Sequence, residues 1–580
     1  MKRLYNDICL LALFFVGTFL FIRINFHFWY HFMEQYMMFQ YTDDYFQELM
    51  KAPGGLSEYF TEYVSQLFYN DLGAPLVLAV LLTLMAGLFH RFLCYCGSKV
   101  AIWAAMIPAF LFWIFPVESV AFPVCIDIAL ALTLAGIVIR QKTSRSIYFL
   151  AIIIVSYLLF SPAQFLIALL WLLYEVLTEK GKGLRWIGVV GLILAFLVPL
   201  VAMRTFFIAS MRDAFFTKNL YHPEYPLPKS LWLVVASFPV CALLAYAVRE
   251  RVFLKNDMAR MIVMDVLILG AMTYKITYTH HPLEQAYRYD YYARQNKWQA
   301  IVDHAEKHGI EDRDALIYLN LALSHTGQMN EKLFNFPQIG EIGFIPHDAK
   351  SRLALIEASE VAWQLGQTNS SQRFAFVGVL SSERRVQSRL MKRLVESYLV
   401  DGEYRAAGKY IKILESSYPY RNWAKQQEAL LDSTVCARTK WVADKRRYLP
   451  ITDNPIDLTI SLPSGVAFLI DDHFDNRPAF EYGMAYLLVY KQLPAFMHYM
   501  GLMRDKGMTF PKLYQEAICL YFSAVHRDPA EMATFKLDQN LVYRFAMFMH
   551  SLSSLSPQEA AQQYGDTYYY YAQFNPGPKE

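Results

Sequence analysis

Charge is scarce in this sequence, and the little that is present nearly cancels. Charged residues make up 18% of the 580-residue chain, and the formal net charge is +3. This balance excludes a nucleic-acid partner, because the chain also lacks a basic stripe, a zinc-ligand cluster and an RNA-binding motif. Cysteine is sparse too, with seven in the chain. Only Cys436 and Cys519 lie in the polar second half, and we expect buried thiols there, because no sequence feature brings their Cα atoms within disulfide reach.

Apolar residues are in excess, and they are unevenly distributed. Hydrophobic residues make up 55% of the chain, more than is usual for a soluble protein. Long apolar runs follow one another as far as Thr279, whereas from His280 onward charged and polar residues alternate with aromatic ones. The sequence therefore predicts an all-α protein with a transmembrane domain over 1–279 and a water-soluble helical domain over 280–580.

Nine apolar runs are candidates for crossing about 30 Å of hydrocarbon. They are Ile8–Ile22, Ala74–Leu93, Val100–Phe115, Ser119–Ile139, Ser146–Phe160, Ala163–Leu177, Trp186–Met203, Leu231–Val248 and Met261–Thr279. We expect the first to be an uncleaved span, because no cleavage site follows it and Arg23 leads into aromatic residues typical of a membrane interface. The two runs within Ser146–Leu177 are short enough for either two spans or a re-entrant hairpin, and both return the chain to the same side.

The basic residues orient these spans. Fourteen Lys and Arg lie in the stretches that are cytoplasmic if the N-terminus is inside, against six in the opposite loops. The fourteen are Lys2, Arg3, Arg91, Lys99, Arg140, Lys142, Arg145, Lys180, Lys182, Arg185, Arg249, Arg251, Lys255 and Arg260. By the positive-inside rule the N-terminus is cytoplasmic, and nine spans then place 280–580 outside the cytoplasm. The expected location is the inner (plasma) membrane.

Helical hairpins recur in the polar half. The clearest is "RLVESYLVDGEYRAAGKYIKILESSYP" (Arg393–Pro419), where Gly402 marks a turn between two amphipathic helices and a proline closes the second. This order resembles the tetratricopeptide (TPR) repeat. Looser copies occur at Tyr287–Gly309, Leu316–Met329 and Ala485–Gly507. The resemblance implies an α-solenoid whose concave surface binds partner proteins; the alternative is a brace for the membrane domain.

The first external loop, residues 31–73, holds an amphipathic segment. In "LSEYFTEYVSQLFY" the apolar residues recur at i, i+3 and i+4, with Glu58, Thr61 and Glu62 on the opposite face. This spacing predicts a helix lying in the membrane interface just before the second span.

An uncleaved first span, an acidic external loop with an interfacial helix, many further spans and a soluble external tail together resemble the GT-C superfamily of polyprenyl-phosphate-sugar glycosyltransferases. The resemblance implies a carboxylate in the first loop that acts as base or ligates a divalent cation, and Asp43 and Asp44 occupy that place. An interfacial carboxylate can take the proton of an attacking hydroxyl. The alternative is that both are ordinary solvated loop charges.

The second external loop, residues 204–230, adds basic residues. Arg204, Arg212, Lys218 and His222 are candidates for holding the phosphate of a lipid-linked donor, and the alternative is headgroup contact. Within the spans, Asp127 lies nearest the midplane, so it should face the bundle interior, paired or neutral.

The whole chain resembles an uncharacterised bacterial family of multi-pass proteins with TPR-like external tails. The matching features are "PGGLSEYFTEYVSQLFYNDLGAP", "YLNLALSHTGQM" followed by "FNFPQIG", and "YGDTYYYYAQF". This resemblance implies no activity. Two functions therefore stay open: a GT-C-like transfer from a polyprenyl-phosphate sugar in envelope glycan synthesis, and a non-catalytic scaffold that recruits envelope proteins. A transporter that uses Asp127 is a more distant third.

Overall fold

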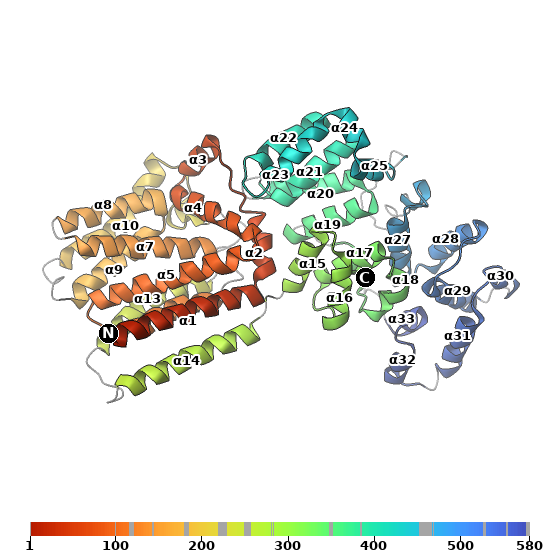
Figure 1. The fold of residues 1–580 in the computed structure, drawn as a ribbon, viewed down its shortest axis with the longest axis horizontal. Helices are drawn as coiled ribbons and strands as arrows, with labels where there is room; N and C mark the ends of the chain where they lie inside the picture. The colour runs from red at the N-terminus through yellow and green to blue at the C-terminus, as the bar shows by residue number, and fades with distance from the viewer. Residues whose placement is uncertain are drawn as a thin grey trace. The chain divides into compact units, whose positions relative to one another are not determined.

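A computed structural model gives the fold of the chain. It describes residues 2–575 apart from 99, 115–120, 142–143, 179–184, 219–228, 249–256, 280, 282, 347–351, 383–385, 450, 452–466, 468, 526–528 and 553–554. Within these residues every regular element is a helix (Figure 1). The predicted all-α class is therefore confirmed for the described part of the chain.

The chain forms two compact units. The first consists of Met1–His281, Ser382–Val386 and Glu415–Asn422. The second consists of Pro282–Ser381, Gln387–Leu414 and Trp423–Glu580.

The first unit is a bundle of apolar helices with several short helices. Its helices before residue 282 are α1 (Lys2–Asn25), α2 (His27–Glu34), α3 (Asp43–Met50), α4 (Gly55–Ser65), η1 (Gln66–Tyr69), α5 (Gly73–Tyr95), α6 (Ala101–Leu111), η2 (Phe112–Ile114), α7 (Ala121–Arg140), α8 (Arg145–Phe160), α9 (Ala163–Leu177), α10 (Arg185–Thr205), α11 (Met211–Phe215), α13 (Lys229–Ala247) and α14 (Asp257–Tyr278).

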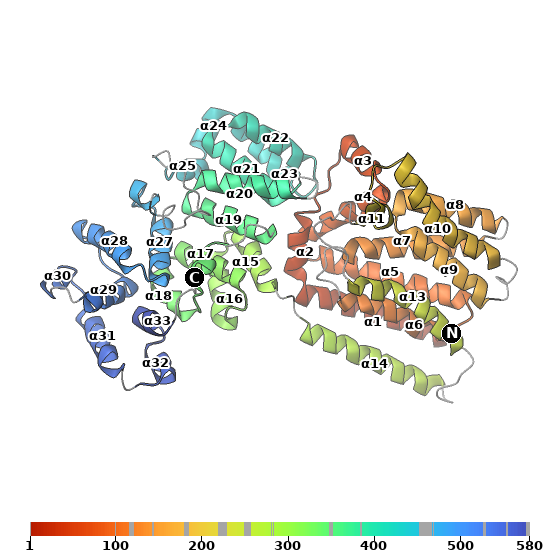
Figure 2. The ribbon, with the colours of Figure 1, turned by 180° about the vertical axis from the view of Figure 1, so that it is seen from behind.

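The long helices pack side by side (Figures 1 and 2). Helix α5 contacts α1, α6 and α7, while α9 contacts α7, α8 and α10. Helices α1 and α5 run antiparallel, since His90 of α5 lies 3.6 Å from Asp7 near the start of α1. The end of α1 and the start of α5 therefore lie at the same end of the bundle.

Among the residues that the structure describes, four helices, not nine, are long and apolar enough to cross a membrane. They are Tyr5–Asn25, Gly73–Tyr95, Ala121–Arg140 and Trp186–Thr205. The helices over four other apolar runs are shorter, namely Ala101–Leu111, Arg145–Phe160, Ala163–Leu177 and Leu231–Ala247. The run Val100–Phe115 shows the physical reason, because its α-helix has only 11 residues before it tightens into the 3-10 turn η2. At 1.5 Å per residue such a helix falls well short of about 30 Å.

The aromatic residues after α1 lie inside the unit. Phe26 breaks the helix with φ −140°, and α2 then continues the chain. Phe26, Trp29 and Tyr30 are all buried, with Trp29 stacked on His281 at 5.0 Å between ring centroids. These rings therefore act as core residues of the bundle.

The second unit is built from short helices. They are α15 (Glu284–Arg294), α16 (Trp298–His308), α17 (Arg313–Thr326), α18 (Met329–Lys332), η4 (Leu333–Asn335), η5 (Gly340–Gly343), α19 (Arg352–Leu365), α20 (Thr368–Ser381), α21 (Ser388–Asp401), α22 (Tyr404–Glu415), α23 (Arg421–Glu428), η6 (Ala429–Leu431), α24 (Ser433–Arg438), α25 (Lys440–Arg446), α27 (Arg477–Val489), α28 (Leu493–Asp505), α29 (Lys512–Val525), α30 (Pro529–Ala533), α31 (Gln539–Ser551), α32 (Pro557–Tyr564) and α33 (Tyr568–Phe574). Helices α22 and α23 also extend into segments of the first unit.

Helix–turn–helix geometry is present at three of the four predicted hairpins, whereas Leu316–Met329 falls mostly on the single helix α17. Gly402 ends α21 in the left-handed conformation with φ +81°, and α22 starts two residues later. The rings of Tyr398 and Tyr410 stack across this turn at 6.0 Å. Tyr287–Gly309 forms α15 and α16, and Ala485–Gly507 falls on α27 and α28. The hairpins agree with the sequence pattern, whereas their assignment to the TPR class stays a prediction.

Candidate functional site

Asp43 and Asp44 open the short helix α3. The hydroxyl of Thr42 caps this helix by accepting a hydrogen bond from the Tyr45 N–H at 3.3 Å. Both aspartates are solvent-exposed, and carboxylates in a first helical turn stabilise the helix dipole. Neither joins a group of three metal-ligand atoms in the described part of the chain. The structure thus shows Asp43 and Asp44 as exposed residues in the first turn of α3.

The predicted phosphate-binding residues lie around α10 and α11. Arg204 is in the last turn of α10 and Arg212 is in α11, and both are exposed. His222 lies outside the described residues. The chain after α11 turns inward, because Lys218 is only 2% exposed.

Helix α4 forms over the predicted amphipathic segment, and it presents its polar face to the protein. Ser57, Glu58, Thr61, Glu62 and Ser65 are each no more than 4% exposed. On the opposite face Phe60 and Tyr63 are about half exposed. Helix α4 packs on α7 and α8. An apolar outer face with a polar inner face is the arrangement expected of a helix that meets lipid on one side and a polar interior on the other.

A glycine turn positions α4. Gly54 has φ +79°, and a Cβ at this residue would lie 2.8 Å from the carbonyl oxygen of Ser161. The Gly54 N–H donates to the Leu158 carbonyl at 3.0 Å. Only glycine meets both demands without strain, so the turn fixes the start of α4 against the α8–α9 connection. The hydroxyl of Thr217 donates to the same Ser161 carbonyl at 3.0 Å, which brings Lys218 to this place.

Three ionisable side chains meet beneath α4. The Lys218 Nζ lies 3.1 Å from a Glu58 carboxylate oxygen and 3.3 Å from one of Asp127 on α7. The Ser57 hydroxyl donates a hydrogen bond to Asp127 as well. All four side chains are nearly or fully buried. We call these residues the buried charge cluster.

The buried charge cluster holds one more negative than positive group when all three are ionised. Burial alone would lower the pKa of Lys218, but the adjacent Asp127 and Glu58 carboxylates outweigh burial and raise it. Lys218 therefore stays protonated between the two carboxylates. Burial favours the protonated form of a carboxyl group, so a carboxylate in this environment can accept a proton.

A second group of polar residues lies near the start of α5. His27 and His31 of α2 both direct Nε2 at an Asp71 carboxylate oxygen, at distances of 3.8 Å and 3.2 Å. In the part of the chain that the structure describes, His27, His31 and Asp71 form the single group of three or more His, Cys, Asp or Glu side chains whose ligand atoms are close enough to hold one metal ion.

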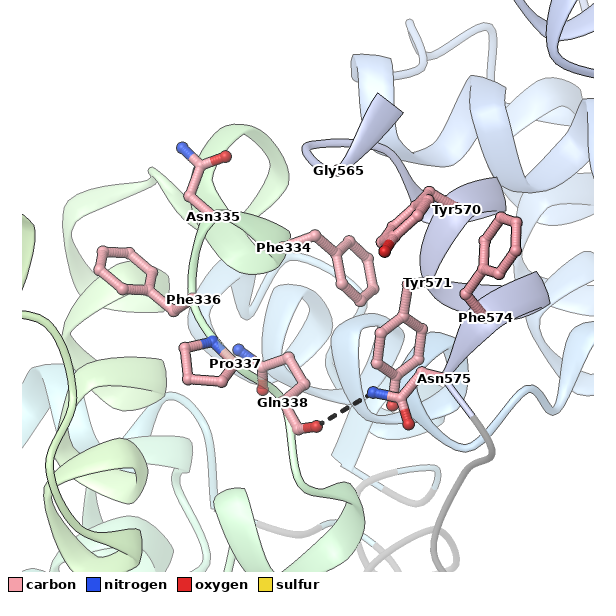
Figure 3. Close-up of a pocket in the computed structure, with 10 residues that line it drawn as sticks. All are labelled: Phe334, Asn335, Phe336, Pro337, Gln338, Gly565, Tyr570, Tyr571, Phe574 and Asn575. Carbon is pink, nitrogen blue, oxygen red and sulfur yellow. Dashed lines mark hydrogen bonds between the residues drawn. The ribbon is translucent and has the colours of Figure 1, made fainter. Parts of the chain in front are cut away.

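The second unit contains an aromatic cleft (Figure 3) with a volume of about 440 Å³. We use the name aromatic cleft for the space lined by Phe334, Asn335, Phe336, Pro337, Gln338, Gly565, Tyr570, Tyr571, Phe574 and Asn575. The rings of Phe334 and Tyr571 lie 4.7 Å apart, and the amide of Asn575 donates to the Gln338 carbonyl at 3.5 Å. Rings with several amides can bind a ligand that has both apolar faces and hydrogen-bonding groups.

One family model matches residues 3–575 of the chain, which is nearly its whole length. The chain belongs to DUF6057, a family of unknown function. The expectation of an uncharacterised family is confirmed in this respect. No curated protein and no solved structure matches the chain. Membership in DUF6057 therefore assigns no chemistry, and the functional argument depends on the residues themselves.

Sequence patterns identified the parts of the buried charge cluster without pairing them. Asp127 was expected to face the interior, and Glu58 belonged to the polar face of the predicted helix. Both residues contact Lys218, and Glu58 lies 160 residues from Lys218 in the sequence. The periodicity of a helix carries no information about such long-range pairs.

Proposed function

We propose that this member of DUF6057 is a multi-pass protein of the inner (plasma) membrane that transfers a sugar from a polyprenyl-phosphate donor in envelope glycan synthesis. Its N-terminus is cytoplasmic, and the second unit, a TPR-like array, lies outside the cytoplasm. The observation that carries the proposal is the buried charge cluster within a bundle of apolar helices.

The energetic cost of these charges argues for a function inside the first unit. Removing an ion from water costs several kcal/mol even after relaxation, and ion pairs recover this cost only in part. Ionisable residues among membrane helices therefore tend to be functional. A scaffold that only anchors an external array needs none of them. The burial of Glu58, Asp127 and Lys218 thus favours chemistry over anchoring.

The roles follow from the charges. Glu58 or Asp127, both in contact with Lys218, takes the proton from the acceptor hydroxyl. That hydroxyl attacks the anomeric carbon of the donor, and the bond from this carbon to the lipid phosphate breaks, so that polyprenyl phosphate leaves. Lys218 positions the two carboxylates. Arg204 and Arg212 are exposed on the segment that leads to Lys218, and they pair with the donor phosphate at the membrane surface. His222 belongs to the same proposed phosphate site.

The membrane arrangement includes the shorter apolar helices. Helices α6, α8, α9 and α13 pack on the long candidate spans α5, α7 and α10 or on one another, so they enter the bilayer with them. Together with α14 they belong to the proposed membrane domain. The excess of Lys and Arg in the loops on the N-terminal side supports the orientation.

The test compares buried with exposed carboxylates. In a strain that lacks the gene, Glu58→Gln and Asp127→Asn are expressed beside the matched controls Asp43→Asn and Asp44→Asn. Each substitution removes a charge and keeps the side-chain shape. Loss of a positioned base lowers turnover by roughly 10² or more, so at least one buried variant should fail to restore the glycan profile. Both exposed variants should restore it.

Two results would change the assignment. If Asp43→Asn or Asp44→Asn fails while both buried variants restore the profile, the base lies in α3 and the buried charge cluster is structural. If all four variants restore it at wild-type protein levels, transfer by any of these carboxylates is refuted.

A scaffold that recruits envelope proteins is the second candidate, and the aromatic cleft favours it. Aromatic and amide side chains suit a peptide segment that supplies both rings and backbone groups. Under this function a Tyr570→Ala variant should fail to complement the strain that lacks the gene, whereas Glu58→Gln and Asp127→Asn variants should complement it. The transferase predicts the reverse order of effects.

A further inference from the structure

We propose that His27, His31 and Asp71 bind one divalent transition-metal ion, with Zn²⁺ preferred, at the end of the bundle where α1 finishes and α5 begins. We call these three residues the His–His–Asp site. The proposal is independent of the transferase, because it concerns residues outside the buried charge cluster.

The distances are close to those of a metal site. With Zn–N and Zn–O bonds of about 2.0–2.2 Å, tetrahedral ligands lie about 3.4 Å from one another. The Asp71 oxygen lies 3.2 Å from His31 Nε2 and 3.8 Å from His27 Nε2. All three ligand atoms lie within 4.8 Å of one another. Small side-chain adjustments bring them onto one ion.

The backbone explains why the three residues meet. His27 and His31 are four residues apart on α2, so they share one face of that helix. The ring of Tyr30 contacts Phe68 at 5.3 Å, which ties α2 to the 3-10 turn η1 just before Asp71. A Cβ on Gly73 would lie 1.6 Å from the Leu67 carbonyl oxygen. The tight turn that presents Asp71 therefore requires glycine.

The ligand types select the metal. Two imidazoles and one carboxylate suit Zn²⁺ and its borderline neighbours better than Mg²⁺ or Ca²⁺, which prefer oxygen ligands. Both imidazoles are buried, whereas the Asp71 side chain is 58% exposed. Three protein ligands leave a fourth position for water or another ligand, and it opens on the exposed side of the site.

A hydrogen-bonded His31–Asp71 pair is the competing explanation. Such a pair needs one imidazole, yet two converge on the same oxygen. Their ring centroids lie 4.7 Å apart at an interplanar angle of 81°, so the rings meet edge to face. This arrangement leaves both Nε2 atoms directed at Asp71. Metal binding and simple pairing differ in what each substitution does, which makes them separable.

The experiment measures Zn²⁺ on the full-length protein in detergent. The protein is stripped with a chelator, dialysed against buffered Zn²⁺ and analysed by elemental mass spectrometry. Wild type should bind about one ion per chain, and Co²⁺ in its place should give the visible absorption of a four-coordinate site. Asp71→Ala should weaken binding at least tenfold, and the double variant His27→Ala/His31→Ala should abolish it.

A matched control uses the other histidine pair with the same spacing. His304 and His308 lie on α16 with ring centroids 4.2 Å apart and do not belong to the three-ligand group in the described chain. The double variant His304→Ala/His308→Ala should keep the bound ion. If the double variant at His27 and His31 fails to fold, Asp71→Ala decides, because that side chain is largely exposed. The proposal is overturned if wild type binds no ion, or if Asp71→Ala binds it as tightly as wild type.

Discussion

Replacing Lys218 by methionine removes the cation of the buried charge cluster and leaves the two carboxylates without it. Lys218→Met keeps much of the side-chain volume, so packing should change little. Its Nζ lies 3.1 Å from Glu58 and 3.3 Å from Asp127, and it is 2% exposed. Losing one partner of a buried pair costs about 3–5 kcal/mol, because the remaining charge stays desolvated. This should lower the apparent unfolding temperature of the first unit by on the order of 10 °C.

The assay is thermal unfolding of the purified full-length protein in detergent, followed by tryptophan fluorescence. Lys51→Met is the matched control, since Lys51 is exposed, and it should shift the midpoint by no more than about 2 °C. The triple variant Glu58→Gln/Asp127→Asn/Lys218→Met removes every charge and should recover most of the loss, because neutral groups carry a smaller desolvation cost. If the unfolding midpoint of Lys218→Met equals that of the Lys51→Met control, the three groups are not a buried ion cluster.

Two further predictions concern topology and the second unit. A reporter that is active only outside the cytoplasm, fused after Glu580, should give signal, and activity of a cytoplasm-only reporter there would refute the proposed orientation. Burial raises the pKa of Glu516 to about 7 against the Tyr568 N–H and Lys512, which act to lower it. Because the folded chain holds this proton above the unfolded pKa of about 4.5, stability should fall by up to about 3 kcal/mol as the pH rises from 4.5 to 7. Glu516→Gln should remove this contribution to the pH dependence of the unfolding free energy, measured by denaturant unfolding. An unchanged pH dependence would contradict a buried, protonated Glu516.

Local patterns in the sequence predicted the local structure well. The i, i+3 and i+4 spacing after Pro53 produced α4, and Gly402 produced the turn between α21 and α22. The helix and the turn are both determined by residues close together in the sequence and by the backbone conformations that each residue type favours. The prediction of nine spans was wrong, since four helices in the described part of the chain are long and apolar enough to cross a membrane. An apolar run does not reveal where its helix ends. In Val100–Phe115 the α-helix stops at Leu111.

Long-range contacts could not be predicted in this way. Asp71 lies 40 residues from His31, and nothing in the first loop distinguishes it from Asp43 or Asp44 as a ligand. The pairing of residues so far apart depends on how helices pack, and one sequence contains no direct signal for it. For the buried charge cluster, the available clue in the sequence was the pair of carboxylates, Glu58 and Glu62, on the polar face of the predicted amphipathic helix. The polar face of α4 is turned toward the protein, and this decides which acids are buried.

Profiling lipid-linked sugars and envelope glycans tests the transferase most directly. The profile of a strain that lacks the gene is compared with that of the same strain carrying the wild-type gene or Asp127→Asn together with Glu58→Gln. If the first unit transfers the sugar, the deletion strain and the strain with the double variant should both accumulate an unused lipid-linked donor and lose the same glycan. The wild-type gene should return the donor and the glycan to their normal levels. An unchanged profile in the deletion strain, or full restoration by a double variant present at wild-type level, would contradict it.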